Sequence, residues 1–184
     1  LYLIKIILMK NLKFILFLFI SAALLSCGDD NNTPAFPLSN ANIAGNYDIS
    51  NLVVSTDITT TLNGVPLKIG TATTTGDLFK VNVVMNADGT YNVEGSYTIN
   101  VRLAPVVGNP VETRDIIDVE NSGTFTLNTT NNTITFSEGL VRDLTGTLEV
   151  QLFNATNFSL FQEVDVTVGS NTESISTNIA FSRK

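Results

Sequence analysis

The sequence predicts an all-β fold, an antiparallel up-and-down β-barrel of about 8-10 strands that follows a hydrophobic N-terminal segment. Three observations lead to this prediction. Apolar and polar residues alternate along most segments after residue 42, and β-branched and aromatic residues are frequent in them. Turns that contain Gly, Asn or Asp separate these segments.

Residues 91–103 show the clearest alternation. The odd positions from Tyr91 to Leu103 are apolar except for Gly95, and the even positions are polar or charged. A period of two gives a strand one dry face and one wet face. At ~3.3 Å per residue the segment would extend about 40 Å, so we expect a bend or β-bulge, with Gly95 as its natural place.

Turn signals divide the chain into short antiparallel segments. Asn63-Gly64 and Ala87-Asp88-Gly89 are typical of tight hairpins, because Gly accepts a positive φ without steric cost. Short hairpins join antiparallel strands, since a parallel pair needs a long crossover. The candidate strands are 46–62, 65–75, 78–86, 90–104, 111–120, 123–128, 133–137, 145–153, 157–168 and 174–182. A closed barrel and an open two-sheet sandwich both satisfy this succession, and we predict the barrel.

The composition excludes several classes of function. The 184 residues include no His and one Cys, and 10 basic against 17 acidic residues give a net charge of −7. Without imidazole there is no Ser-His triad and no His-ligated zinc site. One Cys forms neither an internal disulfide nor a Cys-rich metal site. The acidic balance argues against nucleic-acid binding, and we predict neither a metal nor a cofactor.

Acidic residues gather in one candidate strand. Asp118 and Glu120 lie two positions apart and so share a face, with Asp115 and Arg114 close by. Paired carboxylates serve glycoside hydrolysis, but acidic residues at a sheet edge also prevent aggregation. No Gly-x-Ser-x-Gly motif is present. We therefore predict that the protein is not an enzyme.

The N-terminal residues have the pattern of an export signal. We expect translation to start at Met9, before a short basic segment and an uncharged run of 12 residues, 14–25. A membrane-spanning helix takes ~20 residues. The run ends in Leu24-Leu25-Ser26-Cys27, which resembles the lipobox of bacterial lipoproteins. The resemblance implies cleavage before Cys27 and acylation of Cys27; an uncleaved transmembrane helix or an ordinary secretory signal is the alternative.

This resemblance also implies how the chain is organised and where it resides. The expected parts are a lipoprotein signal peptide (1–26), a lipidated Cys with a flexible linker (27–41) and the β-barrel domain (42–184). Asp29 and Asp30 resemble the surface-export signals of some Gram-negative lipoproteins. We therefore expect lipid anchoring in the outer membrane, and the acidic pair favours exposure at the cell surface.

Short motifs in the domain resemble the lipocalin-like domains of bacterial lipoproteins. The segment 43–49 is similar to the Gly-x-Trp start of lipocalin-like barrels, with Tyr47 in place of Trp. Ala87-Asp88-Gly89-Thr90-Tyr91, followed by Gly95-Ser96-Tyr97-Thr98-Ile99, resembles a hairpin common in such domains. The resemblance covers most of 42–184 and implies a lipocalin-like barrel with an apolar ligand cavity.

The expected partners are the membrane, through the acyl groups on Cys27, and either a small apolar or amphipathic ligand or another envelope protein. Six residues on the dry faces of two candidate strands are the predicted lining of a ligand site: Phe79, Val81, Tyr91, Val93, Tyr97 and Ile99. The alternative is a packed core without a cavity. A structural or adhesive envelope protein would then contact other proteins through strands and loops such as 104–113.

Overall fold

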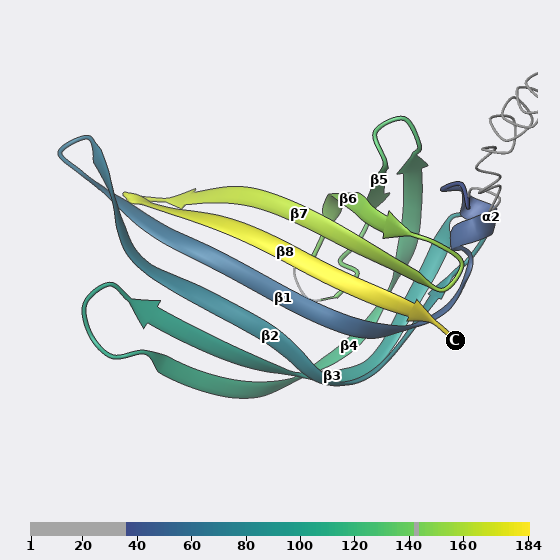
Figure 1. The fold of residues 1–184 in the computed structure, drawn as a ribbon, viewed down its shortest axis with the longest axis horizontal. Coiled ribbons are helices and arrows are strands. Elements are labelled where there is room, and N and C mark those ends of the chain that lie inside the picture. Colours follow the sequence, from purple (N-terminus) through teal and green to yellow (C-terminus); the bar gives the residue numbers. More distant parts are fainter. Residues whose placement is uncertain (1–35, 142–143) are drawn as a thin grey trace, which may run out of the picture. The chain divides into compact units, whose positions relative to one another are not determined.

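In the computed structural model, eight antiparallel strands follow one another around a closed ring (Figure 1). The model describes residues 36–141 and 144–184. The elements are α2 (Asn40–Ile43), β1 (Gly45–Leu62), β2 (Val65–Met85), β3 (Thr90–Pro105), β4 (Val111–Asn128), β5 (Thr133–Phe136), β6 (Gly146–Phe153), β7 (Asn157–Val168) and β8 (Asn171–Arg183). Because β1 pairs with both β2 and β8, the barrel is closed, which confirms the predicted fold class and excludes the open sandwich.

Two predicted breaks between strands are wrong. The candidates 65–75 and 78–86 are one strand, β2, in which Leu78 has a φ of 48° and the pairing with β3 shifts register. This is a β-bulge, which disturbs a strand without ending it. The candidates 111–120 and 123–128 likewise form the single strand β4. Ten candidate segments therefore correspond to eight strands.

The strands are unequal in length, and the barrel is complete only at one end. β5 has 4 residues and β6 has 8, whereas β2 has 21. We call the end with α2 and the β2–β3, β4–β5 and β6–β7 turns the packed end (Figure 1). At the other end, the open end, the hairpins β1–β2, β3–β4 and β7–β8 extend past the short strands. Beyond its four pairs with β5, β4 pairs only with β3.

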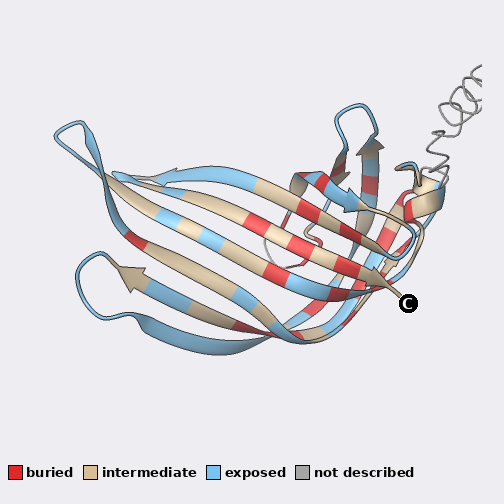
Figure 2. Cartoon of the chain, viewed as in Figure 1, coloured by how far each residue is buried: buried red, intermediate tan, exposed pale blue. Residues whose placement is uncertain are grey.

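Buried side chains concentrate toward the packed end (Figure 2). The rings of Phe158 and Phe181 stack with centroids 4.3 Å apart, and Tyr47 meets Phe158 edge to face at 4.9 Å. Tyr91 and Phe136 make a similar edge contact at 5.2 Å. Such aromatic pairs add about 1 kcal/mol each beyond the apolar area they bury. This part of the barrel interior is therefore a packed core.

Gly95 lies opposite the bulge in β2. It pairs with Val81 just beyond the register shift, and its φ is 130°, a backbone conformation that favours glycine. A Cβ atom built at this position would lie 2.0 Å from the carbonyl oxygen of Lys80. The bulge that we expected at Gly95 itself is thus in the neighbouring strand, and Gly95 provides the space for it.

Arg183, at the end of β8, connects the last strand to the first. Its Nη1 donates to the carbonyl oxygen of Ala44 at 2.8 Å, and its Nη2 donates to Tyr47 Oη at 2.6 Å. The guanidinium lies 5.0 Å from the centroid of the Tyr47 ring, and Tyr47 Oη donates to the carbonyl oxygen of Ile43 at 2.7 Å. These contacts hold the chain entering β1 against the end of β8.

We predict that Gly95→Ala lowers the free energy of unfolding by about 2 kcal/mol more than Gly108→Ala does. Both glycines have a similar φ, 130° and 120°, so the conformational cost of placing alanine there is about the same in the two variants. A Cβ at Gly108 would lie 3.5 Å from Pro105 Cγ, an ordinary contact, so the difference isolates the clash with Lys80. Urea unfolding measures both values, and equal losses would contradict the packing around the bulge.

Tyr47→Phe should cost about 2 kcal/mol of unfolding free energy, because it removes two hydrogen bonds, the one to the carbonyl oxygen of Ile43 and the one from the Arg183 guanidinium. Tyr91→Phe, which removes one bond to the carbonyl oxygen of Glu138, is the matched control and should cost about 1 kcal/mol. Burial raises the pKa of Tyr47 above its ordinary value of 10, against the lowering effect of the Arg183 charge.

The raised pKa sets the direction of the pH dependence in the same experiment. The unfolded chain loses the Tyr47 proton at a lower pH than the folded protein. The contribution of Tyr47 to the free energy of unfolding is therefore complete below pH 10 and decreases above it. Unfolding measured across alkaline pH should show a shallower decline in Tyr47→Phe. An unchanged decline would show that Tyr47 does not contribute to it.

Candidate ligand cavity

A cavity of about 510 Å³ opens inside the barrel between the packed end and the open end. Its walls are the inner faces of β1, β2, β3, β7 and β8, and the β5–β6 connection closes it on the side of the packed end. The lining residues are Leu52, Val54, Thr56, Thr74, Tyr97, Ile99, Val101, Val141, Leu144, Thr145, Gln162, Val164, Val166, Ile175 and Thr177.

The cavity exists because β5 and β6 are short. β5 ends at Phe136, and Val141, Leu144 and Thr145 of the connection to β6 line the cavity between the longer strands. The connection buries Leu140, Val141 and Leu144. Val141 and Leu144 separate the packed core from the cavity on the side of the open end. There β5 and β6 have ended, so neither fills the ring between β4 and β7.

The deep part of the cavity is apolar. Leu52, Ile99 and Leu144 line it, and each is at least nine-tenths buried. The remaining lining residues include polar groups, which belong to four threonines, Gln162 and the phenol of Tyr97. The Gln162 Nε2 donates to the carbonyl oxygens of Thr145 at 2.9 Å and Thr147 at 3.2 Å. Among the residues that the structure describes, no lining residue carries a charge, which favours an uncharged ligand.

The mouth of the cavity exposes apolar side chains to solvent. Val164 and Val166 lie on the dry face of β7, as the alternation in 157–168 predicts, yet 42% and 41% of their surfaces are exposed. They lack cover because β6 does not extend alongside this part of β7. The exposed valines make the cavity accessible from the open end.

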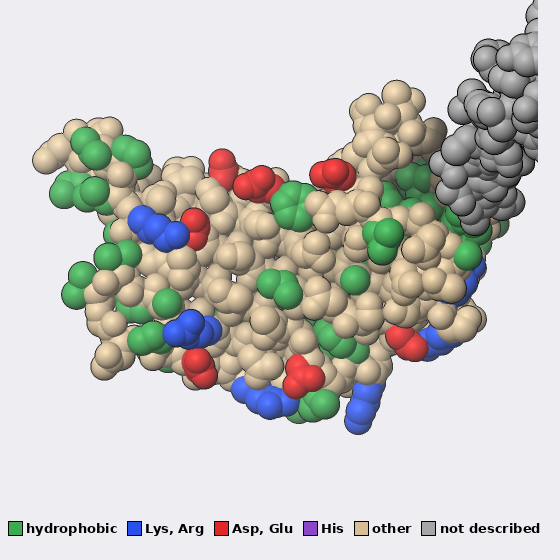
Figure 3. All heavy atoms as spheres, in the orientation of Figure 1, with side chains coloured by type: hydrophobic (Ala, Val, Ile, Leu, Met, Phe, Trp, Pro, Cys, Tyr) green, Lys and Arg blue, Asp and Glu red, His purple; other side chains and the backbone are tan. Residues whose placement is uncertain are grey.

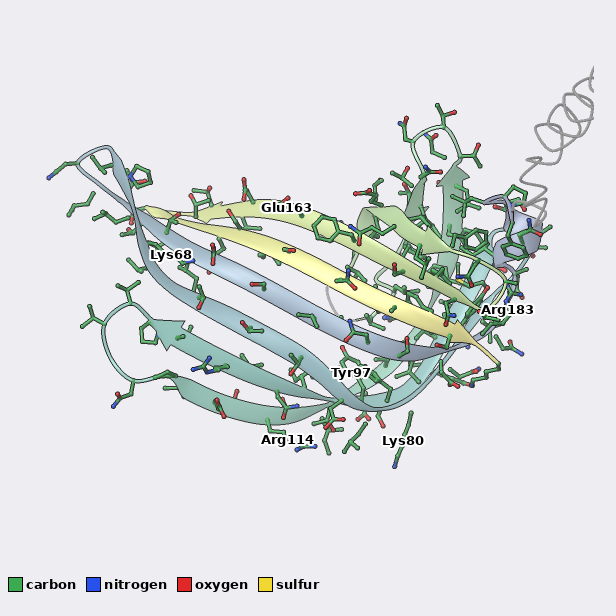
Figure 4. The ribbon with its side chains drawn as sticks, viewed as in Figure 1. Lys68, Lys80, Tyr97, Arg114, Glu163 and Arg183 are labelled. Carbon is green, nitrogen blue, oxygen red and sulfur yellow. The ribbon has the colours of Figure 1, made fainter. Side chains whose placement is uncertain are left out.

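Two of the six predicted ligand residues, Tyr97 and Ile99, line the cavity. Figure 4 labels Tyr97. Phe79 is half-buried and stacks on the Tyr97 ring with centroids 5.9 Å apart, so it supports the wall and is not among the lining residues. The structure therefore brings these three together on neighbouring strands. Their contact with a ligand stays a prediction.

The other three, Val81, Tyr91 and Val93, are buried in the packed core and are not among the lining residues. Tyr91 Oη donates to the carbonyl oxygen of Glu138 at 2.8 Å, and burial raises the pKa of this phenol. These positions follow the predicted alternation but lie below the β5–β6 connection. For these three residues the structure therefore shows a packed core, which was the alternative to a ligand site.

Sequence reasoning did not identify most of the lining. Val141 and Leu144 belong to a connection, and no periodicity marks connection residues as a cavity wall. The alternation at Val164 and Ile175 was a usable signal, because it placed both on dry faces. The alternation does not show which residues on the apolar face of a strand are left uncovered by a neighbouring strand.

The carboxylates of β4 do not form a site. The register of β4 on β3 places Asp118 and Glu120 on one face and Asp115 on the other, and all three are exposed. Within the described residues, no group of three or more His, Cys, Asp or Glu side chains is arranged to hold a metal ion. A hollow of about 420 Å³ on the outer face of β2–β4 holds Arg102 and Arg114, which pair with neighbouring carboxylates.

Cys27 and the predicted signal peptide lie outside the described residues. Within the part of the chain that the structure describes, no helix is long and apolar enough to cross a bilayer.

Comparisons with known proteins leave the family open. No protein-family model and no curated protein sequence matches the chain. Among solved structures, it is similar to the crystal structure of Ail, the attachment invasion locus protein of Yersinia pestis, in complex with the heparin analogue sucrose octasulfate. The identity is 7%, the match covers 77% of this chain and 100% of that one, and the TM-score is 0.25. At this TM-score no property of Ail is transferred to the chain.

Proposed function

We propose that this protein is a lipid-anchored protein of the outer membrane or cell surface whose lipocalin-like barrel binds a small apolar or amphipathic molecule. The observation that carries the proposal is the cavity of about 510 Å³ with an apolar deep wall and an accessible mouth. Its volume falls within the range of ~300–1,000 Å³ that is usual for small-molecule sites. Binding, and no reaction, is the role proposed for it.

The lining specifies the chemistry of the ligand. An ionised group placed in the cavity would lose its hydration, and no charged side chain among the described lining residues replaces it. Apolar groups are expected against Leu52 and Ile99, and hydroxyl or carbonyl groups against Thr56, Thr74 or Thr177. The proposed ligand is therefore an uncharged apolar molecule or an amphipathic one whose charged part stays outside the mouth.

The proposed anchor rests on the lipobox-like segment that ends at Cys27. Acylation supplies about 0.8 kcal/mol for each buried CH₂, so several acyl chains on one residue give a stable attachment. The net charge of −7 disfavours attachment of the folded domain to anionic head groups. In this proposal the acyl groups hold the protein at the outer membrane.

A pair of adjacent threonines tests the cavity. Thr74 lines it, whereas Thr75 lies on the outer face of the same strand. We expect Thr74→Trp to weaken binding of an uncharged fluorescent probe such as N-phenyl-1-naphthylamine at least about tenfold, because the indole occupies the cavity. Thr75→Trp should bind as the parent does. A parent protein that binds no such probe, and that yields no ligand by native mass spectrometry, would contradict the proposal.

The anchor has a separate test. Cells that express the full chain and receive labelled palmitate should incorporate the label into the parent protein, and globomycin should block the removal of residues 1–26. Cys27→Ser should abolish incorporation and release the protein from the membrane fraction. Label in the Cys27→Ser variant, or globomycin-insensitive processing of the parent, would contradict acylation at Cys27.

A further inference from the structure

The open end exposes apolar side chains that do not line the cavity. Figure 3 shows hydrophobic side chains gathered on the two hairpin tips at the left of the view, β1–β2 and β3–β4. Exposed fractions there reach 64% at Val106 and 90% at Val107. The large hydrophobic residues exposed on these two hairpins are Leu62, Val65, Leu67, Ile69, Leu103, Val106, Val107 and Val111.

The open end also has no charge at its tips. The hairpin segments 58–67, 103–111 and 166–172 contain no Asp, Glu, Lys or Arg, in a chain with 27 such residues, the sum of 10 basic and 17 acidic. Backbone hydrogen bonds join the three hairpins into one surface: Val106 N donates to the Ile69 carbonyl oxygen and Thr61 N to that of Ser170, both at 2.9 Å. We call this surface the uncharged end surface.

Behind the β1–β2 and β3–β4 hairpins the first charged residues form cross-strand pairs, and behind the β7–β8 hairpin they are the carboxylates Asp165 and Glu173. Lys68 Nζ lies 2.8 Å from Asp57 Oδ1 on the β1–β2 hairpin, and Arg102 Nε lies 3.4 Å from Glu112 Oε1 on the β3–β4 hairpin. Figure 4 places Lys68 just behind the β1–β2 tip. Each basic side chain is thus balanced by a carboxylate at the same level of its hairpin. With Asp165 and Glu173 counted, the boundary is net acidic, so it has no positive charge with which to attract a polyanion.

The chemistry of the surface distinguishes lipid from protein as its partner. The cores of protein interfaces are enriched in aromatic residues, Met and Arg, and 58–67, 103–111 and 166–172 contain none of them. Their exposed large hydrophobic residues are Leu and Val, and most of them stand on two protruding hairpins, not on a flat face. Aliphatic side chains ahead of a charged boundary are suited to enter hydrocarbon while the charges remain among the head groups.

We propose that the uncharged end surface docks onto a phospholipid bilayer, with the β1–β2 and β3–β4 tips inserted at the boundary of the hydrocarbon. This goes beyond the ligand site, because it assigns a partner to a surface outside the cavity. The inner face of β3 continues from Val101 at the cavity wall to Leu103 near the tip, so docking turns the cavity mouth toward the lipid. Because the charged boundary is net acidic, docking depends on apolar contact and not on anionic lipid.

The experiment uses the full chain reconstituted into phosphatidylcholine vesicles, with an environment-sensitive fluorophore (NBD) on an introduced cysteine. Val107→Cys places it on the uncharged end surface, and Asn131→Cys places it on an exposed polar turn at the packed end. The parent chain, labelled in the same way, measures any reaction at Cys27. We expect NBD at residue 107 to be shielded from iodide about fivefold more than at residue 131, and to be quenched by doxyl groups on lipid chains.

A second set of variants separates apolar insertion from proximity to the vesicle. With NBD at residue 107, Val65→Asp combined with Leu67→Asp on the other hairpin should reduce the inserted-to-free ratio about tenfold or more. Leu152→Asp, at a leucine that is 49% exposed on β6, is the matched control and should leave the ratio unchanged. Addition of phosphatidylglycerol should not raise it.

Three results would overturn the proposal. One is equal iodide access at residues 107 and 131 in vesicles. Another is shielding that appears only after envelope proteins are added, which would make the partner a protein. The third is insertion that requires phosphatidylglycerol, which would make the contact electrostatic.

Discussion

The difference in length between β5 and the other strands is the constraint on which the rest of the structure depends. A ring of eight strands that differ from 4 to 21 residues cannot be complete along its whole length. Where all eight strands are present, their dry faces meet and form a core. Where only six continue, the same alternating pattern leaves an apolar wall facing an open space. The same alternating sequence pattern thus produces the core where the ring of strands is complete and the cavity where it is not.

Stability is concentrated at the packed end as a result. The aromatic contacts of Phe158, Phe181 and Tyr47 lie there, as does the connection of β8 to the entry of β1 through Arg183. The open end is held by hairpin pairing and by few buried side chains. A binding site on such an end can adapt to its occupant while the packed end keeps the ring closed.

The sequence predicts where most strands lie, but it does not predict which elements cover their apolar faces. Alternation in 91–103 and the turn at Asn63-Gly64 predict β3 and the β1–β2 hairpin, because both signals are local. The predicted break after residue 75 is wrong, because a β-bulge at Leu78 interrupts alternation just as a turn does. For the cavity, the exposure of Val164 depends on where β6 ends, and the wall at Leu144 depends on the path of a connection. Neither is encoded in a periodicity, so only Tyr97 and Ile99 of the predicted set lie on the wall.

The short pairing of β5 has a consequence for the movement of molecules into the barrel. β5 is held by four residue pairs to β4 and by four to β6. Detaching it therefore breaks few backbone hydrogen bonds, whereas separating β1 from β2 breaks the ladder over most of 18 residues. Local unfolding at β5 would convert the barrel for a moment into a curved sheet of long strands. Molecules too large for the mouth would then have a lateral route inside, and the rate of that opening would limit their exchange.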